Sequence, residues 1–418
     1  MTATLFTNLF IAAVLLTTAV KLWLARRHLA HIAAHRASVP AAFSEKIELS
    51  AHQKAADYTS AKTRHAMLAA VFDVLVLLAL TLGGGVQWLA TLWQHTFEHV
   101  IAQGIALIAS VTLISSLLEA PFNLYKTFVI EARFGFNKMT FALYLADAVK
   151  ELLLTALFGI PLLYGVLWLM GRMGDNWWLY VWVVWIGFML LIQFIFPSFI
   201  APLFNKFSPL QDETLKAKIE ALLKKCGFTV SGLFVMDGSK RSAHGNAYFT
   251  GFGKTKRIVF FDTLLRSLSP EEIEAVLAHE LGHFKHRHVL KRISYTFAVS
   301  LAFLWLLAQL MHSTWFYNGL GVNMPETEFS TAVALLLFFM VLPVFGFLFK
   351  PLLSFYSRRH EFEADRYAAQ QTAAADLTSA LVKMYQDNAA TLTPDPLYSA
   401  FYDSHPPALV RIDHLQTA

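Results

Sequence analysis

WWLYVWVVWIGFMLLIQFIFPSF, residues 177–199, contains no charged side chain and is long enough to cross a bilayer as a helix. Six more apolar runs free of lysine and arginine cover residues 5–20, 66–93, 101–122, 152–170, 293–311 and 331–349. The chain is 56% hydrophobic and only 15% charged, well outside the range of soluble proteins. The sequence therefore predicts an all-α polytopic membrane protein with seven transmembrane helices.

The distribution of lysine and arginine predicts which side each loop occupies. With the N-terminus outside, the external segments are residues 1–4, 94–100, 171–176 and 312–330, and they hold one of the 34 basic residues, Arg172. Cytoplasmic loops carry the excess of lysine and arginine. The segments at about 200–291 and from Lys350 onward are therefore predicted to be cytoplasmic. This bias also explains the net charge of +5, and the sequence has no nucleic-acid motif.

A metal-binding pattern lies in the first of these inner segments, at His279-Glu280-Leu281-Gly282-His283. On a helix, His279 and His283 share one face and can bind one cation, and Glu280 can take a proton from water beside it. A helix start at Ser269-Pro270-Glu271-Glu272, ten residues upstream, supports the helical placement. The alternative is a pair of solvated histidines on an amphipathic helix.

Two residues are candidates for a third ligand. His286 lies on the same face as His279, but Lys285, Arg287, His288 and Lys291 around it resemble a membrane-surface flank. Val289 excludes the metzincin pattern, which needs a histidine there. Glu361 is the better candidate, because a carboxylate from a second helix completes a His₂Glu zinc site, and Asp365 shares its face and can hold a ligand histidine. A solvated charged helix is equally compatible with residues 357–365. The single cysteine, Cys226, excludes both an internal disulfide and a cysteine zinc site.

The chain divides into four predicted segments. Residues 1–199 hold helices one to five with cytoplasmic loops, 200–291 the zinc motif, 292–353 helices six and seven, and 354–418 the part that completes the active site. The inner segment is expected to be a small α+β domain. Its elements are a helix over 213–225 ended by Gly227, strands over 228–236 and 257–262, and a short strand over 246–251 before a Gly-Lys-Thr turn. An edge strand can pair with an extended peptide, and a plain structural hairpin is the alternative.

The sequence resembles the type 1 CAAX prenyl protease family of integral-membrane zinc endopeptidases. Besides the His279–His283 pentad, the matching stretches are TFVIE (127–131), GFNK (135–138), IAPLFN (200–205), SKRSAHGNAYF (239–249), KRIVFFD (256–262), SRRHEFEAD (357–365) and SHPP (404–407). They extend from the third apolar run to the end of the chain, and the stretches around Asn246 and His405 are the most diagnostic.

The resemblance implies a function for each matching site residue. His279, His283 and Glu361 would bind one zinc ion, with Glu280 as the general base. Asn246, with Ala247 and Tyr248 on the same strand, would hold the substrate backbone. His405 and Arg411 would line the site and stabilise the oxyanion. The family fold is a ring of seven helices around an intramembrane chamber, capped by the zinc domain.

The expected partners are therefore the lipid bilayer and a peptide or protein substrate, either prenylated or unprenylated. The substrates would be CAAX-type C-termini or membrane proteins undergoing quality control. His286, a short link between spans six and seven and the C-terminal His-Leu-Gln-Thr-Ala depart from the family pattern, and they favour a bacterial inner membrane over the endoplasmic reticulum. Two alternatives are a site-2-type intramembrane protease and a non-enzymatic transporter or scaffold with a structural metal. The sequence indicates no oligomeric state.

Overall fold

The computed structural model describes residues 1–251, 256–323 and 330–416. In these ranges seven helical segments are long and apolar enough to cross a membrane, which confirms the predicted number. The segments are Ala3–His35, Leu49–Leu80, Val100–Glu131, Phe141–Arg172, Gly174–Phe204, His288–Leu310 and Thr331–Gln371. Their main helices are α1 (Ala3–His35), α2 (Leu49–Leu80), α4 (Val100–Tyr125), α5 (Phe141–Arg172), α6 (Trp177–Ile195), α11 (His288–Leu310) and α13 (Thr331–Gly346), which continues into α14 (Lys350–Gln371).

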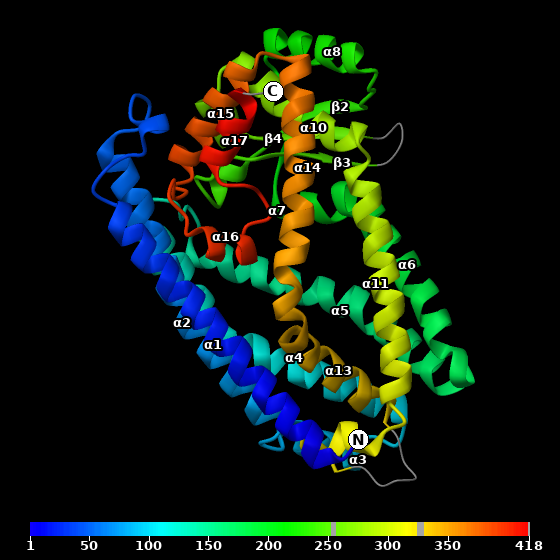
Figure 1. Ribbon diagram of the computed structural model, residues 1–418. Coiled ribbons are helices and arrows are strands. Elements are labelled where there is room, and N and C mark those ends of the chain that lie inside the picture. The colour runs from blue at the N-terminus through cyan, green and yellow to red at the C-terminus, as the bar shows by residue number, and fades with distance from the viewer. Residues whose placement is uncertain (252–255, 324–329, 417–418) are drawn as a thin grey trace.

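The seven segments contact one another in a closed cycle. Helix α1 contacts α2, which contacts α4, and the contacts continue through α5, α6, α11 and α13 back to α1. Figure 1 shows α1 with α2 and α6 with α11 on opposite sides of the molecule. Only 6–22% of the residues in the apolar windows of the first six segments are buried, against 50% in the last. The helices therefore form a closed ring, and most of the residues in the first six spans are not buried against other parts of the protein.

The second predicted run, residues 66–93, is not one helix, and this boundary was wrong. Helix α2 ends at Leu80, and a separate helix, α3 (Gly85–Thr96), begins after a turn. Gly84 in the turn has φ +80°, a conformation that glycine adopts without strain. A Cβ on Gly83 would lie 2.6 Å from the carbonyl oxygen of Ala79. Three consecutive glycines thus break the run, and α3 turns back to pack on α4.

The last span is bent and longer than predicted. Pro343 lies inside α13, and a short 3₁₀ turn, Phe347–Phe349, joins α13 to α14. Proline removes a helical hydrogen bond, which accounts for the bend. Helix α14 then continues to Gln371, so the expected boundary at 353/354 falls inside it. The boundaries at 199/200 and 291/292 likewise fall inside helical segments.

The inner segment and the C-terminal residues form one α+β domain. Its sheet has the order β1-β2-β4-β3, in which β2 and β4 are parallel and the two outer strands are antiparallel to their neighbours. The strands are β1 (Phe207–Pro209), β2 (Gly232–Met236), β3 (Ala247–Thr250) and β4 (Arg257–Phe261). The helices are α7 (Ala201–Phe204), α8 (Glu213–Cys226), α9 (Asp262–Ser267), α10 (Pro270–Lys285), α15 (Ala374–Asp387), α16 (Pro396–Tyr402) and α17 (Ala408–Gln416).

Most predicted elements of this domain are confirmed. Helix α8 ends at Gly227 with φ +71°, and the short strand β3 lies at one edge of the sheet within the described residues. Strands β2 and β4 are shorter than predicted, and β1 was missed because three residues give no recognisable alternation. The Gly-Lys-Thr turn lies outside the described residues. Apolar side chains from α8, β4, α10, α14 and α15 share one core.

Two polar clusters fix this domain to the spans. The guanidinium of Arg241 donates to Asp147 of α5 at 2.8 and 3.0 Å and to Asn205 at 2.6 Å. In the second cluster, the Tyr58 hydroxyl of α2 lies 2.7 Å from both carboxylate oxygens of Glu131 at the end of the third span, and His244 of the domain places its Nε2 3.6 Å from Oε2 of Glu131. The orientation of the domain over the ring therefore depends on specific charged contacts, some of which fall in the family-like stretches.

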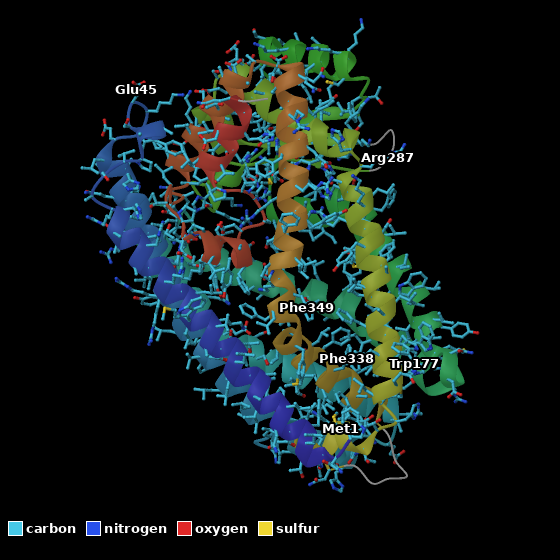
Figure 2. All side chains as sticks on the ribbon, in the orientation of Figure 1. Met1, Glu45, Trp177, Arg287, Phe338 and Phe349 are labelled. Atoms are coloured by element: carbon cyan, nitrogen blue, oxygen red, sulfur yellow. The ribbon has the colours of Figure 1, made fainter. Side chains whose placement is uncertain are left out.

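The α+β domain and the N-terminus lie at opposite ends of the molecule. Figure 1 shows α8, the sheet and the C-terminus at one end and the N-terminus with α3 at the other. In Figure 2, Glu45 and Arg287 lie toward the domain end, whereas Met1 and Trp177 lie at the other. This arrangement agrees with the predicted sides of the loops relative to one another. The shorter elements are η1 (Ala41–Phe43), η3 (Gly174–Asn176), η5 (Gly238–Lys240) and α12 (Thr314–Asn318).

Candidate metal centre and active site

Helix α10 begins with the capping box that the sequence predicts. The Ser269 hydroxyl accepts from the backbone N–H of Glu272, and the Glu272 carboxylate accepts from that of Ser269. The Glu272 carboxylate also accepts from Ser379 and Lys383 of α15, so the start of α10 is fixed to a second helix. The next turns bury Leu277, Ala278 and Leu281 in the domain core, which places His279 and His283 against α14.

Three nitrogen and oxygen donors meet between α10 and α14. The Nε2 atoms of His279 and His283 lie 3.2 Å apart, and the carboxylate oxygens of Glu361 lie 3.5 and 3.4 Å from them. In a tetrahedral zinc site with bonds of 2.0–2.1 Å, neighbouring ligand atoms lie about 3.3 Å apart. The separation of the two nitrogens is close to that edge, and each nitrogen lies at a similar distance from a different oxygen of Glu361. Within the described residues these three side chains form the one group suited to a metal ion.

The chemistry of the donors also fits a cation. Glu361 is buried, and its Oε2 has no hydrogen-bond partner among the described residues. A buried carboxylate oxygen without a partner is costly, and a cation would satisfy it. At His279, burial alone would lower the pKa, but the neighbouring carboxylates of Asp365 and Glu361 raise it to about 9. Burial and the neighbouring His279 lower the pKa of His283 to about 3. The site thus stabilises a positive charge between the three donors, but it does not stabilise the protonated forms of both imidazoles at once.

His279 is held from behind by a buried ion pair. Its Nδ1 lies 2.8 Å from Asp365 Oδ1, as predicted for a residue that orients a ligand. The Arg411 guanidinium donates to both oxygens of Asp365, at 2.9 and 2.5 Å, and Asp365 is fully buried. Arg411 Nη1 lies 3.8 Å from Glu361 Oε2. The structure therefore places Arg411 behind the donors rather than on their open side.

Glu280 and His405, the other two residues predicted to act in catalysis near the donors, differ in their exposure. Glu280 is half-buried, and this burial raises the pKa of its carboxyl above the ordinary value, as suits a group that exchanges protons. His405 lies in the loop before α17, with 64% of its side chain exposed and its Nε2 3.5 Å from Glu361 Oε1. The His405 side chain can therefore reach a molecule that approaches the donors from outside.

The predicted substrate strand, β3, presents one free edge in the described part of the chain. The Ala247 and Phe249 side chains pack into the domain core, and Phe249 lies 4.9 Å from the ring of Phe284 on α10. Tyr248 points to the other face, where it lines a cavity of about 200 Å³ with Pro202. The exposed Asn246 side chain accepts from the Ala247 N–H at 2.8 Å.

Comparisons with known proteins match almost the entire chain. Residues 28–206 match the family described as "CAAX prenyl protease N-terminal, five membrane helices", and residues 209–418 match "Peptidase family M48". The chain belongs to peptidase family M48. The Saccharomyces cerevisiae protein named CAAX prenyl protease 1 is 33% identical over 399 residues, 90% of this chain and 88% of the relative. A human homologue of that name is 35% identical over 364 residues, 77% of this chain and 75% of the relative.

A solved structure shows the same architecture. The crystal structure of S. mikatae Ste24p superposes with a TM-score of 0.90 at 30% identity, covering 98% of this chain and 99% of that chain. This M48 peptidase is therefore an integral, multi-pass membrane metalloprotease with the Ste24p fold, and the sequence-based recognition of its family is confirmed.

Sequence reasoning missed one part of the peptidase site. His288, interpreted as part of a surface flank, is buried and bonds to His283 and Glu363, because the chain turns sharply after α10. His286 is exposed, and the structure does not bring it to the three donors. The spacing His283-x₄-His288 was visible in the sequence, but only the turn that joins α10 to α11 gives it meaning.

Gly282 lets the two donor-bearing helices of the peptidase approach each other. A Cβ there would lie 2.9 Å from Ala364 Cα and 3.1 Å from Ala364 O. We expect G282A to destabilise the protein by about 1–3 kcal/mol through overpacking and to reduce bound zinc, because α10 must move away from α14. Thermal unfolding in detergent and metal analysis measure both effects. G187A in α6, where a Cβ meets no described atom within 4 Å, is the matched control and should be neutral or stabilising.

Proposed function

We propose that this M48 peptidase is a zinc endopeptidase that hydrolyses peptide bonds at the cytoplasmic surface of its membrane. The observation that carries the proposal is the placement of His279, His283 and Glu361 at tetrahedral distances, with Glu280 on the next position of the helix. One zinc ion per chain would be held by these three side chains. When bound, zinc supplies Lewis acidity and lowers the pKa of water.

Each side chain of the site has a separate role in the proposed reaction. Glu280 takes the proton of the attacking water and returns it to the leaving amine. His405 on the open side donates a ring N–H to the developing oxyanion. Asp365 and Arg411 keep His279 in the orientation that directs its Nε2 toward the other donors. The free edge of β3, with Asn246, Ala247 and Tyr248, binds the extended substrate backbone.

The geometry favours this proposal over the two alternatives. A site-2-type protease carries its zinc motif within a membrane span, whereas α10 lies in the α+β domain, ahead of the sixth span. A structural metal needs a closed shell of four protein ligands. Within the described residues the group has three protein ligands. The exposed His405 side chain lies next to Glu361, on a side of the group that solvent can reach.

The substrate is proposed from the relatives' names together with the position of the site. Relatives named CAAX prenyl protease 1 suggest C-terminal CAAX-type segments, with or without a prenyl group, and the position over the ring also suits membrane proteins undergoing quality control. The excess of lysine and arginine supports a cytoplasmic site. A bacterial inner membrane stays a prediction, since the relatives reported above are eukaryotic.

One experiment tests the function. Purified protein with quantified zinc is incubated with one peptide in prenylated and unprenylated forms. Cleavage of both forms would make the prenyl group incidental, and cleavage of the prenylated form alone would support CAAX processing. Zinc-loaded protein that cleaves neither these peptides nor a set of membrane-protein substrates would contradict the proposed function.

Asn246 is expected to contribute one substrate hydrogen bond. We predict that N246A retains zinc and lowers kcat/KM about tenfold, the equivalent of about 1.4 kcal/mol. Steady-state kinetics on the cleaved peptide measure this effect. N176A, an exposed asparagine beside α6 at the other end of the molecule, is the control and should not change kcat/KM. Equal kinetics for N246A and the wild type would remove β3 from the substrate site.

A further inference from the structure

The second donor histidine, His283, has its own buried partner. The Nδ1 of His283 lies 2.9 Å from Nδ1 of His288, and Nε2 of His288 lies 2.9 Å from Oε2 of Glu363. Only 5% of the His288 side chain is exposed. These contacts form a chain from the donor group through two imidazoles to a carboxylate on α14.

An unusual turn brings His288 to this position. Helix α10 ends at Lys285 and α11 begins at His288, and between them Arg287 has φ +56°. A left-handed conformation is unfavourable for a residue with a side chain, so surrounding contacts must hold it. The His288 ring lies parallel to the ring of His360, with centroids 4.0 Å apart. The turn and the stack together direct Nδ1 of His288 at His283.

We propose that His288, held by Glu363, is a positioning residue that fixes the tautomer and orientation of His283. A histidine that uses Nε2 as a ligand carries its proton on Nδ1. That N–H of His283 donates to the unprotonated Nδ1 of His288. His288 then carries its own proton on Nε2 and donates it to the Glu363 carboxylate. In this arrangement of protons, Nδ1 of His283 and both ring nitrogens of His288 each have a hydrogen-bond partner.

The arrangement gives the two donor histidines equivalent support. His279 donates from Nδ1 to Asp365, whose charge is balanced by Arg411. His283 donates to His288, and His288 donates to the Glu363 carboxylate. Glu363 also lies 3.5 Å from Nε of Arg359. Both ligand orientations are thus set by carboxylates of α14, the helix that also carries Glu361. If His288 only filled space, a phenyl ring would replace it, since stacking on His360 needs no polar atom.

The test measures zinc affinity by chelator competition on the full-length protein in detergent, with no substrate present. H288F keeps the ring but offers His283 no acceptor, and we expect it to bind zinc about 10–100-fold more weakly. H288Q can both accept and donate, and should stay within about threefold of the wild type. H95F, the same change at an exposed histidine of α3 at the other end of the molecule, is the matched control and should leave zinc affinity unchanged.

The outcomes separate positioning from packing. A positioning residue changes zinc affinity while the thermal stability of the zinc-free protein stays near the wild-type value, whereas a packing residue changes that stability. Unchanged zinc affinity in H288F, or equal losses in H288F and H288Q, would overturn the inference. If H288F does not accumulate, the zinc affinities of E363L and E363Q are compared instead, because only glutamine keeps an oxygen that can accept from His288. Equal zinc affinity of these two variants would overturn the inference. The inference rests on the proposed zinc site, but the two can fail separately. A wild-type protein that binds no zinc would contradict the zinc site, whereas the variants above test only the role of His288.

Discussion

Replacing Glu280 by glutamine is expected to lower kcat by about 10²–10⁴-fold while zinc stays bound. Glutamine has nearly the same size, but its amide cannot accept the proton of the attacking water. The three donors do not include Glu280, so their geometry should persist. Metal analysis and peptide cleavage on the same purified sample measure the two properties independently.

A matched variant tests whether the loss is specific to this position. E271Q changes an exposed glutamate on the same helix, which pairs with Lys218 at 2.6 Å, and should leave both zinc and kcat unchanged. Undiminished turnover in E280Q would eliminate Glu280 as the general base. Loss of zinc together with activity would instead show that Glu280 supports the metal site.

Local patterns in the sequence predicted much of the fold and the donor group. Apolar runs reveal spans because a helix in lipid must satisfy its backbone internally and present apolar side chains. His279 and His283 could be paired because helical periodicity alone brings i and i+4 together. The capping box at Ser269 and the Gly227 helix end are likewise decided by neighbours in sequence. The structure confirms the number of spans, the capping box and the helix end at Gly227, and it places His279 and His283 side by side.

Features that depend on tertiary contact could not be predicted in this way. Nothing in the sequence near Arg411 indicates that its guanidinium meets Asp365, 46 residues away. His288 resembled a surface residue because its neighbours are basic, and only the Arg287 turn buries it. Strand β1 is too short to show a period, and it exists because β2 offers it an edge. His405 and Arg411 were predicted as site residues only from the family resemblance. The structure shows that His405 is exposed and Arg411 is buried.

The Arg411–Asp365 pair should carry the largest effect on stability. R411M retains much of the apolar volume but leaves the fully buried Asp365 carboxylate without its cation, and we expect a loss of about 3–5 kcal/mol. Unfolding in detergent, followed with and without added zinc, measures the loss. R266M removes an arginine from an exposed ion pair with Asp262 and should cost less than about 1 kcal/mol.

The double variant R411M/D365N identifies the cause of that loss. Asparagine removes the uncompensated charge yet keeps an oxygen that can accept from His279 Nδ1, so the double variant should be more stable than R411M alone. Its zinc affinity should stay close to that of R411M, because Nδ1 of His279 keeps an oxygen acceptor in both variants. If R411M lies within about 1 kcal/mol of the wild type, the buried charge is compensated by another group and Arg411 is free to act on the substrate. If instead the double variant is no more stable than R411M, the loss comes from the packing of the arginine side chain, and the charge pair is not what orients His279.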